Sequence, residues 1–105
     1  MVVLAFAALL EASGDALVRN GLRTGNASQR LLWFAAGALV LFSYGWVVNA
    51  PPWDFGRLLG LYIVFFFIAA QFISWLAFGQ PPSRSVVIGG LLILGGGLTI
   101  ALSEA

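Results

Sequence analysis

The sequence contains no cysteine and no histidine, and all five of its basic residues are arginine. Without cysteine the chain can form neither a disulfide nor a thiolate. Without histidine it lacks the commonest metal ligand and the commonest general base. Its glycine-rich stretches lie inside apolar runs, which is the wrong context for a phosphate-binding loop. We therefore expect no enzyme activity, no bound metal and no cofactor.

Charge is scarce as well: only 9% of the residues are charged, whereas 61% are hydrophobic. A soluble domain carries about 25% charged residues, so this chain has too few to cover the surface of a soluble globule. A formal net charge of +1 gives no electrostatic reason to expect nucleic acid as a partner. The lipid bilayer is the environment that fits this composition.

What the sequence does have is long apolar runs, each close to the roughly 20 residues that span a bilayer. Gly21, Gly25 and Asn26 mark the first connection, and a pair of prolines marks each of the other two, because proline lacks an amide donor and resists helix. The first run lacks the basic segment of a signal peptide and is interrupted by Glu11, so we expect it to be retained. The sequence predicts an all-α membrane protein, a four-transmembrane-helix bundle forming one domain over residues 1–105. The predicted helices cover about 2–18, 31–48, 57–78 and 85–102.

The arginines predict how the bundle is oriented. Arg19, Arg23 and Arg30 flank the first connection and Arg84 lies in the third, whereas only Arg57 lies near the opposite face. Because an excess of arginine and lysine marks cytoplasmic connections, we expect both termini to lie outside a bacterial-type inner membrane.

Glu11 is the strongest single indication of function. A carboxylate near the middle of a membrane helix is costly and must face protein or a water-filled cavity. It therefore suits a proton carrier, although a structural role as a hydrogen-bond donor between helices is the alternative. Asp15 lies one turn further along the same helical face. It either titrates together with Glu11 or pairs with Arg19 another turn on, and the sequence does not decide between the two.

A second set of residues suggests packing or oligomerisation. Gly89 and Gly96 are seven residues apart, as are Gly90 and Gly97, so each pair shares one face of the last predicted helix. Glycines on such a face let another backbone approach closely, within one chain or between chains. Gln71 is a polar side chain deep in the third helix and is interpreted as a hydrogen-bonding contact between helices.

The chain resembles a known family in the first and third runs. Leu9–Arg19 reads LLEASGDALVR, with a membrane glutamate at Glu11, Gly14 three residues later and Arg19 at the end of the apolar stretch. Ile73–Gln80 reads ISWLAFGQ and ends in a Gly-Gln turn. With the paired glycines of the last run, the length and the helix count, these segments resemble the small multidrug resistance family of the drug/metabolite transporter superfamily.

The resemblance implies a dimer, usually antiparallel, that exports organic cations or guanidinium-like ions in exchange for protons. It implies that Glu11 binds proton and substrate in turn, and that Tyr62 is an aromatic residue near the substrate, although a plain packing role for Tyr62 is equally compatible with its position. The alternative is a non-transporting subunit that packs against a partner membrane protein through the last helix, in a homo-dimer or hetero-oligomer. A lipid-carrier flippase subunit is a third interpretation.

Overall fold

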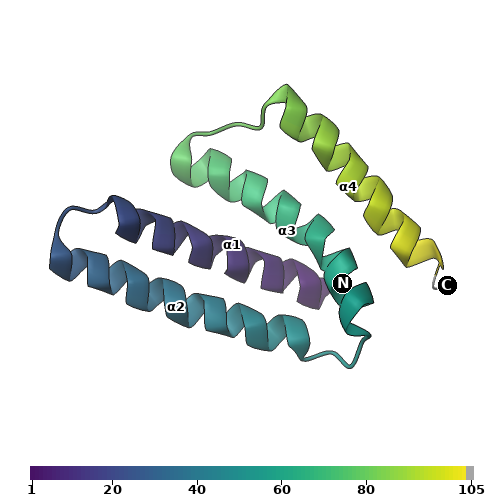
Figure 1. Ribbon diagram of the computed structural model, residues 1–105, viewed down its shortest axis with the longest axis horizontal. Helices are drawn as coiled ribbons and strands as arrows, with labels where there is room; N and C mark the ends of the chain where they lie inside the picture. The colour runs from purple at the N-terminus through teal and green to yellow at the C-terminus, as the bar shows by residue number, and fades with distance from the viewer. Residues whose placement is uncertain (104–105) are drawn as a thin grey trace.

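The computed structural model describes residues 1–103, which form a wholly helical arrangement (Figure 1). Within these residues α1 packs against both α2 and α3, whereas α4 packs against α3 alone. The α1–α2 and α3–α4 connections lie toward one end, and the start of α1 and the end of α4 lie toward the other (Figure 1). The helices are α1 (Val2–Arg23), α2 (Ala27–Asn49), α3 (Phe55–Phe78) and α4 (Arg84–Ser103).

The first connection is shorter than the sequence indicates. Helix α1 continues to Arg23 instead of ending near residue 18, and α2 begins at Ala27 instead of near residue 31. Gly21, interpreted from the sequence as part of the connection, lies inside α1, where an added Cβ would come within 2.6 Å of the Phe34 ring. The true break is at Asn26, whose side chain accepts hydrogen bonds from the first amides of α2. Apolar runs therefore underestimate helix length where a helix continues into polar residues beyond the run.

Two glycines bring α1 and α2 into close contact. A Cβ on Gly14 would come within 2.6 Å of Leu41, and a Cβ on Gly37 would come within 2.8 Å of Val18 and 3.3 Å of the Gly14 carbonyl oxygen. Leu41 of α2 thus packs against Gly14 of α1, and Val18 of α1 packs against Gly37 of α2. Small-residue packing of this kind is how membrane helices associate. It sets the position of α1, and so of Glu11, along the axis of α2.

Helix α1 is the most enclosed of the four, because it lies between α2 and α3 (Figure 1). Its buried residues are small or apolar, and Leu4, Ala7 and Ala8 are almost completely inaccessible. By contrast, large side chains such as Leu76 (80% exposed) and Leu92 (73%) point outward from α3 and α4. An outward-facing apolar surface is what a lipid-facing bundle requires.

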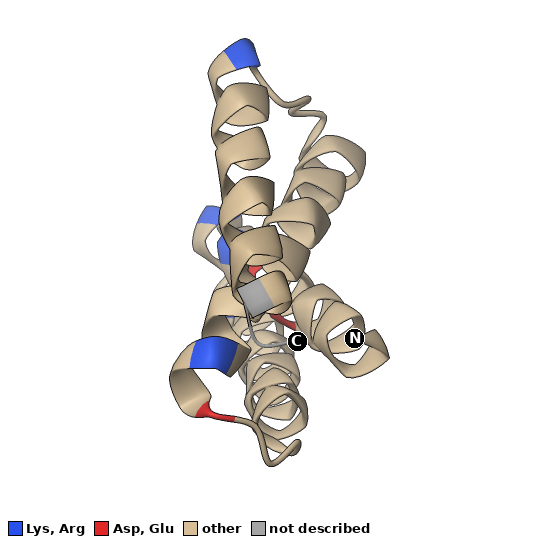
Figure 2. Ribbon diagram, turned by 90° about the vertical axis from the view of Figure 1, so that its right-hand side faces the viewer, with Lys and Arg blue, Asp and Glu red and all other residues tan. Residues whose placement is uncertain are grey.

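Three helices, α2, α3 and α4, are long and apolar enough to cross a membrane. Helix α1 is 22 residues long but is not among these candidate spans. Its charged side chains Glu11, Asp15, Arg19 and Arg23 lower its hydropathy. The prediction of four helices is confirmed, but only three of them qualify as spans by length and composition. Figure 2 shows how little of the ribbon is charged.

Candidate functional site

The candidate site is built around Glu11, near the middle of α1. Because α1 lies between α2 and α3, the Glu11 side chain is half-buried although it carries a carboxyl group. Ala7, Ala8 and Ala12 surround it on the same helix and are buried. Small side chains at these positions let α3 approach closely enough to reach the carboxyl group.

Tyr62 of α3 makes that contact. Its hydroxyl group lies 2.8 Å from Glu11 Oε1 and 3.2 Å from the Ala7 carbonyl oxygen. The ring is 4% exposed, so the hydroxyl group is held in a fixed position. The family resemblance placed Tyr62 near the substrate, and the structure brings its hydroxyl group into contact with Glu11.

The Tyr62 hydroxyl group can satisfy Glu11 in either protonation state. When the carboxylate is ionised, the phenol can donate its single hydrogen to Oε1. When the carboxyl group is protonated, it can itself donate to the phenol oxygen, and the phenol can turn its hydrogen to the Ala7 carbonyl oxygen. Neither state leaves a buried polar group unpaired, which is what a site that gains and loses a proton requires.

Sequence reasoning missed Tyr44 of α2. Its ring stacks on Tyr62 with a centroid distance of 5.6 Å and an interplanar angle of 30°. Phe66, one turn along α3, also stacks on the Tyr62 ring, with a centroid distance of 6.1 Å. Tyr44 and Tyr62 are the two tyrosines of the chain, and both lie in apolar runs, which is the signal that could have identified them. Three helices therefore contribute to the site.

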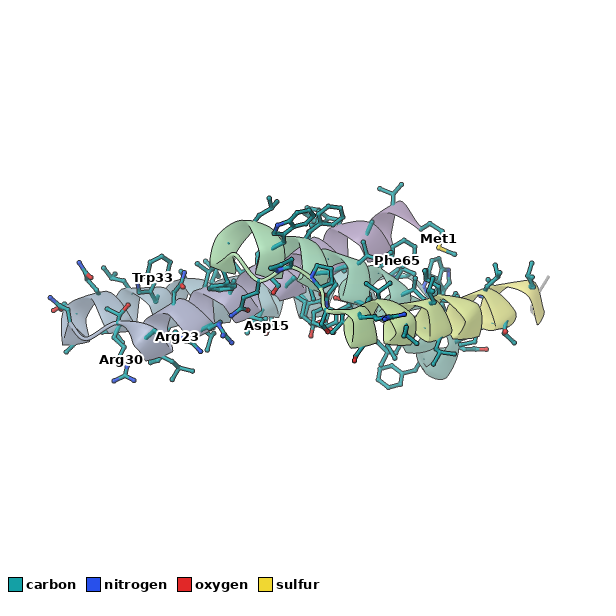
Figure 3. The ribbon with its side chains drawn as sticks, turned by 90° about the horizontal axis from the view of Figure 1, so that it is seen from above. Met1, Asp15, Arg23, Arg30, Trp33 and Phe65 are labelled. Atoms are coloured by element: carbon teal, nitrogen blue, oxygen red, sulfur yellow. The ribbon has the colours of Figure 1, made fainter. Side chains whose placement is uncertain are left out.

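Asp15 and Arg19 continue the line of polar residues from Glu11 toward the α1–α2 connection. Asp15 is exposed, and it lies between Arg23 and Met1 along the long axis (Figure 3). Within residues 1–103 it forms no ion pair with Arg19. The Arg19 guanidinium instead lies over the Phe78 ring, 5.1 Å from its centroid. Asp15 and Arg19 both line an open groove of about 230 Å³ between α1 and α3.

The two glycine pairs predicted on α4 have different surroundings. A Cβ on Gly90 would come within 2.6 Å of the Phe67 ring, and a Cβ on Gly97 would collide with Val64. These two glycines therefore receive side chains of α3 in the same chain. Gly89 and Gly96 would meet no atom within 4 Å, so their face of α4 is open in the described part of the chain.

Gln71 lies on the wall of a second groove, of about 320 Å³, between α3 and α4. Apolar side chains and Gly90 form most of its lining, including Phe67, Trp75 and Leu94. In the described residues the Gln71 side chain makes no hydrogen bond. A hydrogen-bond partner for Gln71 would therefore have to come from another molecule, and its predicted role as a contact between helices stays a prediction.

The acidic residues do not form a metal site within residues 1–103, since no group of three or more potential ligands lies close together there. The chemistry that the arrangement offers is binding of a proton or a cation by Glu11. Asp15 adds a second negative charge one turn away.

Comparison with known proteins identifies relatives over most of the chain. UPF0060 membrane proteins of Streptomyces avermitilis and Streptomyces coelicolor are each 36% identical over 91 residues, covering 86% of this chain and 79% of theirs. A UPF0060 membrane protein of Saccharopolyspora erythraea is 33% identical over 97 residues, 91% of this chain and 86% of its own. No family model and no solved structure matches the chain.

Proposed function

Since the chain belongs to the UPF0060 family of membrane proteins, we propose that it is one subunit of a proton-coupled exporter for small organic cations, with Glu11 as the shared site for proton and cation. The observation that carries this proposal is the 2.8 Å contact between Tyr62 and Glu11. It supports the resemblance to small multidrug resistance transporters, because that resemblance implies an aromatic residue of the third helix near the substrate, which the membrane glutamate would bind.

Exchange follows from competition for one carboxyl group. A proton on Glu11 neutralises it, so a cation binds there only after the proton has left. If the loaded and protonated forms can change which side they face and the empty ionised form cannot, each cation exported brings protons back. The energetic reason is that a bare carboxylate in the membrane interior is costly, whereas a neutralised one is not.

A dimer completes this mechanism. Transporters are commonly built from two related halves around a site at the middle of the membrane, and this chain supplies one half. Within residues 1–103 helix α4 contacts only α3, and its open face carries Gly89 and Gly96. Small residues on an open membrane helix favour close packing against another helix, so we propose this face as the subunit contact.

We further propose that α1 crosses the membrane together with the three apolar helices. Its central carboxyl group is half-buried between α2 and α3, and its neighbours on the same turn are buried. Its remaining charges lie toward the connection end, where a helix meets the headgroups. Under this proposal the arginine-rich end faces the cytoplasm and both termini lie outside an inner membrane.

A second candidate is a non-transporting subunit that packs against another membrane protein. The open glycine face of α4 and the unpaired amide of Gln71, in the described residues, favour a protein neighbour but do not require transport. Solid-supported-membrane currents from purified, reconstituted protein separate the two. Currents that depend on both an added organic cation and a proton gradient support the exporter, and silence across a panel of cations supports the second candidate.

A further inference from the structure

The groove between α1 and α3 lies in the half of the bundle that carries the α1–α2 and α3–α4 connections. Helix α1 lines it with Asp15 and Arg19, and α3 lines it with Ser74 and Phe78, with Gln80 just beyond. Gly79 ends α3 in the left-handed conformation (φ 61°). The chain therefore turns back, and the backbone N–H of Gln80 donates to the Ser74 carbonyl oxygen. This backbone hydrogen bond holds Gln80 beside Ser74 at the polar end of the groove.

The two charges in this groove have no ionic partner among residues 1–103. The Arg19 guanidinium carbon lies over the Phe78 ring, 5.1 Å from its centroid, and the Arg19 Nε is buried without a hydrogen-bond partner among these residues. Asp15 is exposed and lies one turn deeper, about 6 Å along the helix axis. Contact with an aromatic face holds a guanidinium by cation–π attraction and leaves its terminal N–H groups free to bind a carboxylate.

The opposite signs restrict what the groove can hold. A cation would be attracted by Asp15 and repelled by Arg19. An anion would be attracted by Arg19 and repelled by Asp15. A molecule carrying both charges about one helical turn apart satisfies both groups. We propose that the groove is a substrate subsite for small zwitterions, whose ammonium group contacts Asp15 and whose carboxylate binds Arg19.

The size and the direction of the groove agree with this assignment. Its volume of about 230 Å³ is below the roughly 300–1,000 Å³ of pockets for drug-sized ligands, so it suits a small molecule such as an amino acid. Asp15 is the charge nearer to Glu11 on α1. A zwitterion bound in this way presents its ammonium group toward Glu11. The inference rests on the proposed exporter function, and it names the substrate class.

Equilibrium binding tests the subsite without any proton gradient. Isothermal titration calorimetry on purified protein in lipid nanodiscs would compare β-alanine, 4-aminobutyrate and 5-aminopentanoate with n-butylammonium and pentanoate, which carry one charge each. At least one zwitterion is expected to bind about tenfold or more tightly than both singly charged analogues, because a charge-assisted pair to arginine is among the strong ones. Equal affinities, or no saturable binding of any zwitterion, would overturn the assignment.

Variants test whether Arg19 is responsible. Arg19→Gln should remove the preference for the zwitterion over n-butylammonium, whereas Arg23→Gln, an exposed arginine outside the groove, should leave it unchanged. If Arg19→Gln fails to fold, Arg19→Lys keeps the charge, loses the planar fork and should retain only part of the preference. If the Arg19 and Arg23 variants lost the preference for the zwitterion equally, the preference would depend on net charge alone, and the subsite would be overturned.

The two proposals fail in different ways. Zwitterion binding without any proton-driven current would remove the exporter and leave the subsite. Proton-driven currents with n-butylammonium but no preference for a zwitterion would remove the subsite and leave the exporter.

Discussion

The Tyr62 hydroxyl group lies 2.8 Å from Glu11 Oε1, joining α3 to the carboxyl group at the middle of α1. The same hydroxyl group lies 3.2 Å from the Ala7 carbonyl oxygen. A single phenol thus serves two acceptors, and it can change partner when Glu11 gains or loses a proton.

Replacing Tyr62 with phenylalanine should impair transport while preserving the fold. The ring would still stack on Tyr44 and Phe66, but the ionised form of Glu11 would lose its donor. The proton then competes better with the cation, so half-maximal transport should move to higher pH. The Michaelis constant for the cation near neutral pH should rise about 3- to 30-fold, as expected for a hydrogen bond inside a membrane.

Tyr44→Phe is the matched control for this change. Tyr44 contributes its ring to the stack, and within the described residues its hydroxyl group makes no hydrogen bond. Because this change removes no hydrogen bond to Glu11, the pH profile of Tyr44→Phe should shift less than that of Tyr62→Phe. If both variants shift the profile equally, the contact between Tyr62 and Glu11 does not set the proton affinity of the site.

The adjacent glycines Gly96 and Gly97 should respond differently to leucine. Gly97→Leu places a side chain where Val64 already lies, so the chain should lose about 1–3 kcal/mol of stability through overpacking, seen as a lower unfolding temperature. Gly96→Leu meets no atom of its own chain and should fold normally, but its yield of cross-linked dimer should fall. A full dimer yield from Gly96→Leu would show that this face of α4 contacts lipid.

Orientation can be tested with a topology reporter fused to the C-terminus. Four arginines at the connection end oppose Arg57 alone at the other, and this bias predicts one orientation with both termini outside. A protein that inserts only one way cannot build an antiparallel homodimer, so such a pair would need a second, oppositely inserted protein. Comparable inside and outside populations would contradict the fixed orientation and restore the antiparallel homodimer.

The sequence predicted the helical architecture and the central carboxyl group because both depend on local properties. Apolar runs reveal helices, and Glu11 stands out as a charge inside one. The ring stack of Tyr44 on Tyr62 and the contact of Arg19 with Phe78 join different helices. Such contacts depend on how the helices rotate about their axes, which the length of an apolar run does not determine.

The glycines show the same limit more sharply. Their spacing placed Gly89 with Gly96 and Gly90 with Gly97, but it did not show which pair faces α3. Gly21 was misinterpreted as part of a connection because glycine both breaks helices and permits close packing. Only the position of Phe34 on the neighbouring helix distinguishes the two roles.

The most direct test of the account is the proton-coupled current of Glu11→Gln. This change keeps the shape of the side chain and an oxygen that can accept from Tyr62, but it removes the charge and the titrating proton. Reconstituted wild-type protein should give a cation-dependent current driven by a proton gradient. The Glu11→Gln protein, shown by size-exclusion chromatography to fold and assemble like the wild type, should give none. A wild-type current from that variant would contradict the assignment of Glu11 as the shared proton and cation site.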